Sequence, residues 1–123
     1  MSYDQTLRYF TWLSGALVIV LFGLPWLALT LFGLDQGTAP EVITRRAGIL
    51  FLGFFLLAPA LRRVQDSTTR RMISRALAVM MLVMAGLGMA EWGLGRAGPG
   101  LILASITELA FCLAFLRLMK HPD

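Results

Sequence analysis

Glu108 is the residue of this chain whose type and position could do chemistry most directly. It lies near the middle of an apolar stretch that runs from Pro99 to Lys120. At 1.5 Å per helical residue the stretch measures about 30 Å, enough to cross a bilayer, and Glu108 lies about 13 Å from the Pro99 end. A charge at the bilayer centre costs at least ~2.5 kcal/mol, so a carboxylate there needs a partner, a proton or water. Glu108 is therefore a candidate functional side chain.

Three further ionisable residues are expected at a similar depth. Arg45 and Arg46 precede the purely apolar part of the second hydrophobic segment, and Glu91 lies in the last turns of the third. We expect these three side chains and Glu108 to meet in one half of the membrane, because their depths differ by less than the reach of an arginine side chain. The aromatic residues expected to line the same pocket are Trp26, Trp92 and Phe111.

Three interpretations of this polar cluster are open. Glu108 and one arginine could form a structural ion pair that sets the register of the helices. The cluster could instead be the floor of a cavity that binds the polar head of a hydrophobic ligand or carries protons. Glu108 could also be protonated and hydrogen-bonded to Ser105, Thr107 or a neighbouring backbone group, since burial disfavours the charged form of a carboxyl group.

Several kinds of active site are excluded by residue type. The single histidine, His121, lies in the C-terminal tail and the single cysteine, Cys112, in an apolar stretch, which argues against haem ligation and dithiol chemistry. A metal site would need Glu91 and Glu108 beside arginines that repel cations, so we expect no metal and no cofactor. An acid/base isomerase or cyclase that uses the two glutamates stays open, but we expect a protein that is not an enzyme.

The composition indicates an integral membrane protein. The chain has 123 residues, 58% of them hydrophobic, and a formal net charge of +4. A soluble domain of this size could not bury so much apolar surface. The basic residues cluster where hydrophobic runs end, which is typical of membrane flanks, so we expect no nucleic-acid binding.

Hydrophobic runs predict an all-α, four-helix membrane bundle that forms a single transmembrane domain over residues 1–123. The expected helices cover about 9–34, 39–61, 74–95 and 99–120. Pro25 predicts a kink in the first. Thr38 and Glu41 fit a capping box at the start of the second, with Pro40 in its first turn. The first run is too long for a signal peptide, so we expect it to stay as a membrane helix.

Charge predicts the orientation in the membrane. The linker between the second and third helices and its flanks hold the densest block of positive charge, formed by Arg62, Arg63, Arg70, Arg71 and Arg75. The positive-inside rule places this linker in the cytoplasm, and with four spans both termini lie on the same side. The block could contact anionic lipid headgroups, although a solvated topology signal explains it too. We expect a multi-pass protein of the bacterial inner membrane.

Two segments carry a resemblance to a known group of proteins. EVITRRAGILFLGFFLLAP, from Glu41 to Pro59, and ITELAFCLAFL, which begins at Ile106, resemble the small four-helix bacterial inner-membrane proteins around the DoxX type. The resemblance implies a membrane-embedded accessory subunit or a protein of unassigned role, in some relatives associated with quinone-linked oxidoreductases. It also implies that Arg46 and Glu108 form the matching polar pair. Small multidrug exporters are less similar, because their essential glutamate lies in the first helix.

These observations lead to two functional hypotheses. In the first, the protein binds a lipophilic ligand, such as a lipid or a quinone-like molecule, or acts as an accessory subunit of a membrane complex. In the second, it is a small oligomeric transporter, coupled to protons or cations through Glu108. The expected partners are membrane lipids, a lipophilic small molecule, and either further copies of the chain or a larger membrane complex.

Overall fold

The computed structural model describes residues 1–121, in which every regular element is helical. The elements in chain order are α1 (Tyr3–Val18), the π-helical turn η1 (Ile19–Gly23), α2 (Pro25–Leu31), α3 (Thr38–Arg62), α4 (Ser67–Gly93) and α5 (Gly100–Lys120). Four helical segments are long and apolar enough to cross a membrane: α1 with η1, then α3, α4 and α5. The predicted fold class, an all-α four-helix membrane bundle, is confirmed.

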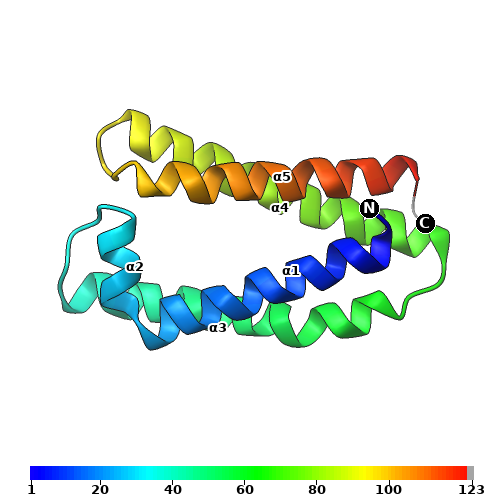
Figure 1. Cartoon of the computed structure of the whole chain (residues 1–123), viewed down its shortest axis with the longest axis horizontal. Coiled ribbons are helices and arrows are strands. Elements are labelled where there is room, and N and C mark those ends of the chain that lie inside the picture. The colour runs from blue at the N-terminus through cyan, green and yellow to red at the C-terminus, as the bar shows by residue number, and fades with distance from the viewer. Residues whose placement is uncertain (122–123) are drawn as a thin grey trace.

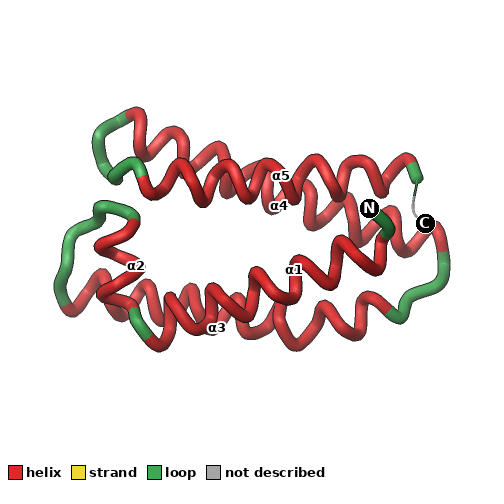
Figure 2. Tube along the Cα trace, in the orientation of Figure 1, coloured by secondary structure: helices red, strands yellow, loops and turns green. Residues whose placement is uncertain are grey.

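The helices form two halves. In one half α1 and η1 pack along α3, and α2 turns across the end of that pair (Figure 1). The other half is the hairpin of α4 and α5, which run side by side along their whole length. The loops that join the long helices lie at the two ends of the bundle, and Figure 2 shows one further break, between η1 and α2. Each half thus places one face of its helices toward the other half and leaves the rest to lipid.

The first hydrophobic segment differs from the single kinked helix predicted over 9–34. It begins at Tyr3, because Ser2 and Gln5 form a capping box in which each side chain accepts a hydrogen bond from the other residue's backbone N–H. It breaks at Leu24, whose φ of −132° and ψ of 58° lie outside the helical region. The residue before a proline is disfavoured in the helical conformation, so Pro25 starts a new helix.

Two other helix starts also differ from the prediction. The capping box of Thr38 and Glu41 is wrong: Gly37 occupies the N-cap position with no side-chain hydrogen bond, and Thr38 is already helical. The helix α4 begins at Ser67, a full two turns before the predicted start near Ser74. Asp66 caps it by accepting a hydrogen bond from the backbone N–H of Thr69 at 2.9 Å.

The main hydrophobic core joins the two halves at the end that holds both termini. Phe10 of α1 is at its centre, with edge-to-face ring contacts at centroid distances of 5.7 Å to Phe54, 5.9 Å to Phe111 and 5.8 Å to Phe115. The buried members come from α1, α3, α4 and α5 and are Tyr3, Leu7, Phe10, Ala58, Leu77, Ala78, Met81, Cys112, Phe115 and Leu118. A second cluster, of Leu21, Ala28 and Phe51, lies within the first half alone.

At the opposite end the halves meet through backbone rather than side chains. The N–H of Gly98, in the α4–α5 turn, donates to the carbonyl oxygen of Phe32 at 2.7 Å. A Cβ on Gly33 would lie 2.6 Å from the Cα of Gly98, and Gly33 has a φ of 64°. Only glycine combines this positive φ with the absence of a Cβ, so only glycine fits here without strain. The loop after α2 therefore rests directly on the α4–α5 turn.

Positive charge gathers at the end with the termini. Figure 1 shows both termini and the α3–α4 loop at this end, which we call the basic end. Among the lysines and arginines, only Arg45, Arg46 and Arg96 belong to the other end. This asymmetry agrees with the charge pattern on which the predicted orientation depends, and the cytoplasmic placement of this end stays a prediction.

Candidate functional site

Glu91 and Glu108 line one cavity between the two halves of the bundle. Its volume is about 390 Å³, and Glu91 comes from α4 and Glu108 from α5. The remaining lining residues are apolar: Leu34, Met84, Leu87, Gly88, Ala97 and Leu101. The cavity lies where the main core ends, on the side of the α4–α5 turn. The structure thus places both predicted glutamates on the lining of the same cavity.

The two carboxylates border the cavity at different depths. Glu91 lies two residues before the end of α4 at Gly93, whereas Glu108 lies eight residues after the start of α5 at Gly100, so Glu108 lies about 9 Å farther from the turn along the helix axis. Gly88 and Glu91 are three residues apart and fall on one face of α4, as Leu101 and Glu108 do on α5, seven residues apart. At Gly88 a methyl group would collide with the hydroxyl oxygen of Ser105, so α4 and α5 approach closely between the depths of Glu91 and Glu108.

Glu108 has a buried carboxylate oxygen without a partner. Its side chain is half-buried, and Oε2 accepts no hydrogen bond within residues 1–121. Neither neighbour named in the sequence prediction supplies one: the Ser105 hydroxyl is buried without a partner, and Thr107 donates to the Leu103 carbonyl at 3.0 Å. Leaving a buried polar group unsatisfied costs about 1–3 kcal/mol. Oε2 of Glu108 is therefore available to accept a hydrogen bond from a molecule in the cavity.

Glu91 has a cation partner outside the cavity lining. Its carboxylate lies 3.6 Å from a guanidinium nitrogen of Arg96, five residues on, in the α4–α5 turn. The Arg96 side chain is 67% exposed, compared with 32% for Glu91, so solvent or headgroups screen the pair. Glu91 thus lies at the outer rim of the cavity.

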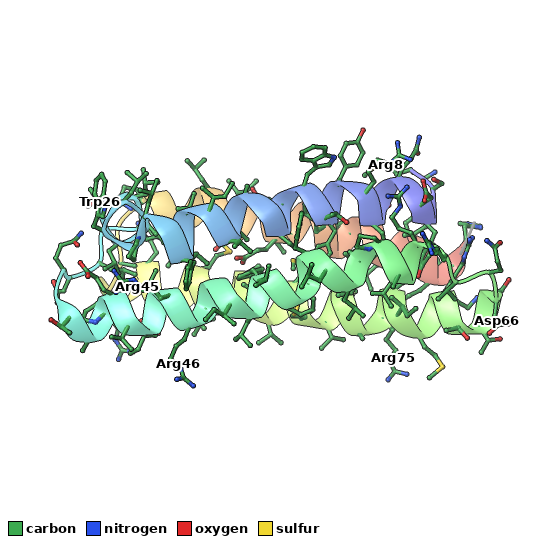
Figure 3. All side chains as sticks on the ribbon, turned by 90° about the horizontal axis from the view of Figure 1, so that it is seen from below. Arg8, Trp26, Arg45, Arg46, Asp66 and Arg75 are labelled. Carbon is green, nitrogen blue, oxygen red and sulfur yellow. The ribbon has the colours of Figure 1, made fainter. Side chains whose placement is uncertain are left out.

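The two arginines predicted to join the glutamates do not reach them. Arg45 pairs with Glu41 on its own helix at 3.9 Å, and Arg46 borders a separate surface depression with Ile49 and Leu50. Figure 3 shows Arg46 pointing away from the bundle. Across the described part of the chain, neither arginine forms an ion pair with Glu91 or Glu108. A structural ion pair between Glu108 and an arginine is therefore not formed.

The rotation of α3 explains this separation. Gly48 packs against η1, where a Cβ would lie 2.8 Å from the backbone nitrogen of Phe22. Arg46 precedes Gly48 by two residues, or about 200° around the helix, so it faces nearly the opposite way. The direction of the arginines therefore depends on which helix α3 packs against, which a depth estimated from the sequence does not contain.

The aromatic residues predicted to line the pocket lie elsewhere. Trp26 on α2 and Trp92 on α4 are 54% and 45% exposed, and neither borders the cavity. Phe111 packs on the main core and borders a different apolar groove, with Tyr9 and Leu13. Lipid-facing tryptophans near helix ends are typical of an interfacial belt.

Two lining residues come from turns that the prediction did not consider. Leu34 follows α2 and Ala97 lies in the α4–α5 turn. The sequence signal for these lining residues was the pair of neighbouring glycines, Gly33 and Gly98, because glycines in two separate turns allow the backbones of those turns to touch.

In the part of the chain that the structure describes, no group of three or more histidine, cysteine, aspartate or glutamate side chains could hold a metal ion.

The lining defines what the cavity can bind. An ionised carboxylate only accepts hydrogen bonds, and a protonated one also donates. No arginine or lysine is among the lining residues, so the cavity has nothing to pair with a phosphate or carboxylate headgroup. Its chemistry suits a neutral or cationic head attached to an apolar body.

Comparison of this chain with known protein families, with curated proteins and with solved structures found no match. The resemblance to DoxX-type proteins stays a prediction. The polar pair of Arg46 and Glu108 that it implies is not formed, because the two side chains lie in different halves of the bundle and Arg46 faces outward.

Proposed function

We propose that this multi-pass membrane protein binds a lipophilic molecule, quinone-like in its polar head, in the cavity of Glu91 and Glu108. The observation that carries the proposal is the buried, unpartnered Oε2 of Glu108 at an otherwise apolar cavity. Small-molecule sites typically have about 300–1,000 Å³ and a few polar groups in an apolar lining. At about 390 Å³, with two carboxylates, the cavity has this character.

The head group is selected by hydrogen bonding. A quinol hydroxyl would donate to the Glu108 carboxylate, and a quinone carbonyl would accept from its protonated form. Anionic phospholipids are poor candidates for this cavity, since Glu108 would repel the phosphate and Arg96, at the rim, is already paired with Glu91. The apolar tail would lie against Met84, Leu87 and Leu101.

Binding of short-chain quinone analogues to the purified protein tests the proposal. Decylubiquinol and decylubiquinone would be titrated into wild-type protein and Glu108→Gln in detergent micelles, by isothermal calorimetry. We expect Glu108→Gln to weaken quinol binding by about tenfold or more, because a hydrogen bond to a charged group contributes about 1.5–3 kcal/mol. Glu41→Gln is the matched control, since Glu41 pairs with Arg45 away from the cavity.

Two results would refute the binding proposal. One is that neither analogue binds the wild-type protein. The other is that Glu41→Gln weakens binding as much as Glu108→Gln, which would show that the loss does not come from the cavity.

The second candidate function is proton- or cation-coupled transport. It is favoured by the same two carboxylates, which come from different helices: Glu108 forms no ion pair within residues 1–121, and Glu91 pairs only with Arg96 at the rim. In proteoliposomes this function requires substrate uptake that depends on an imposed pH gradient and is lost in Glu108→Gln. Quinol binding without any gradient-driven uptake would favour the binding protein over the transporter.

An accessory role in a larger complex of the bacterial inner membrane is a further part of the proposal. Native mass spectrometry of the protein, gently extracted from that membrane, would detect a co-purified quinone or partner subunits. An accessory role requires partner subunits in stable association with the chain, whereas a protein that acts alone would carry only its ligand.

A further inference from the structure

Two arginines on the lipid-facing side of α4, Arg71 and Arg75, have no carboxylate partner. Both side chains are exposed, and within residues 1–121 no aspartate or glutamate oxygen lies within the 4.0 Å of an ion pair. Figure 3 shows Arg75 pointing away from the bundle at the basic end. No carboxylate side chain of residues 1–121 therefore neutralises the charge of Arg71 and Arg75 through an ion pair.

The nearby acids are already engaged. Asp4 lies 2.8 Å from Arg62 and 3.4 Å from Arg8. Asp66 accepts hydrogen bonds from the backbone and the side chain of Thr69 at the start of α4. Since these carboxylates have other partners, no aspartate or glutamate of residues 1–121 supplies the counter-charge for Arg71 and Arg75.

The position of the pair along α4 indicates what surrounds it. Arg71 and Arg75 follow Ser67 by four and eight residues, or about 6 and 12 Å along a helix that crosses the membrane. Their apolar neighbours Met72 and Val79 are 67% and 54% exposed, as expected for side chains that contact acyl chains. The guanidinium groups can extend toward the interface while their methylene groups stay in the apolar layer.

The spacing of the pair favours one shared anion. Residues four apart lie one above the other on a helix, and two like charges there repel each other. An anion between them would remove the repulsion, and a guanidinium presents two parallel N–H donors that match the oxygens of a phosphate. The pair thus forms a phosphate-binding arrangement that opens toward lipid.

We propose that Arg71 and Arg75 bind the phosphate of an anionic phospholipid in the leaflet at the basic end. The lipid is favoured over free phosphate because acyl chains can cover Met72 and Val79, which an inorganic ion would leave exposed. This surface is separate from the cavity of Glu91 and Glu108, so the two proposals can succeed or fail independently.

Native mass spectrometry of the whole protein with equal amounts of phosphatidylglycerol and phosphatidylcholine tests this proposal. We expect wild-type protein to retain phosphatidylglycerol in preference, and Arg71→Gln with Arg75→Gln to lower its affinity about thirtyfold, at about fivefold for each arginine near an anionic surface. The single variants, each with about a fivefold loss, keep the test open if the double variant does not fold.

Arg46→Gln is the matched control. Arg46 is also unpaired within the described residues, exposed, directed away from the bundle and eight residues after the start of its helix, but Val42 stands where a second arginine would be needed. We expect it to leave phosphatidylglycerol binding unchanged. Equal loss in Arg46→Gln, equal retention of the two lipids by wild-type protein, or full displacement by millimolar inorganic phosphate would each overturn the proposal, the last by showing a free-phosphate site.

Discussion

Gly48 on α3 provides a sharp test of how the first half of the bundle packs. A Cβ built at Gly48 would lie 2.8 Å from the backbone nitrogen of Phe22 and 3.0 Å from its Cβ. Gly53, on the same helix, has nothing within 4 Å of such a Cβ. Alanine in place of either glycine favours the helix by a similar amount, about 0.5–1 kcal/mol. The comparison of Gly48→Ala with Gly53→Ala therefore isolates the cost of the contact.

The expected size follows from the displacement required. Carbon and nitrogen atoms pack at about 3.5 Å, so η1 and α3 would have to move apart by roughly 0.7 Å. Because the obstructing atom belongs to the backbone, no change of rotamer can relieve the contact. Overpacking of this kind typically costs about 1–3 kcal/mol. The free energy of unfolding of Gly48→Ala is thus expected to be about 1–3 kcal/mol lower than that of Gly53→Ala.

Unfolding in mixed micelles measures this difference. The two variants would be titrated from a non-ionic detergent into sodium dodecyl sulfate and followed by circular dichroism. A Gly48→Ala variant as stable as Gly53→Ala would refute the close approach of α3 and η1. It would also remove the reason given above for the outward direction of Arg46.

Two further predictions concern the basic end. Tyr3→Phe should lower the free energy of unfolding by about 1 kcal/mol, because the buried Tyr3 hydroxyl donates to the Leu61 carbonyl at 2.9 Å. Tyr9→Phe, at an exposed side chain, should change nothing in the same titration, and equal effects would contradict the prediction. Hydrogen bonds from the Thr69 hydroxyl and backbone N–H hold the pKa of Asp66 below its usual value. This stabilisation is present above the unfolded pKa of about 3.9 and is lost as the pH falls through the lower folded pKa. Thermal melts should therefore show a smaller acid-induced loss of stability in Asp66→Asn than in the wild-type protein, the remainder coming from Asp4, whose ion pair with Arg62 is also lost on protonation. Identical pH profiles of the two proteins would refute the prediction.

The sequence by itself determined the membrane class and the four spans. The spans follow from composition, because apolar runs of this length can be buried only in a bilayer. The antiparallel arrangement of α4 and α5 follows from connectivity, since the turn between them is short, but Glu91 and Glu108 border the cavity about 9 Å apart along the helix axis. Helix ends were less predictable: the capping box at Thr38 was wrong, and the cap at Asp66 moved the start of α4 by two turns.

Only the tertiary structure decided which helix faces meet. The sequence places Arg45 and Arg46 at a suitable depth, but depth does not set rotation, and the packing of Gly48 on η1 turns Arg46 outward while Arg45 pairs with Glu41. The cavity exists because the main core joins the two halves at one end and the backbone contact of Gly33 with Gly98 joins them at the other. These contacts link residues far apart in the chain, and no local pattern of residues specifies them.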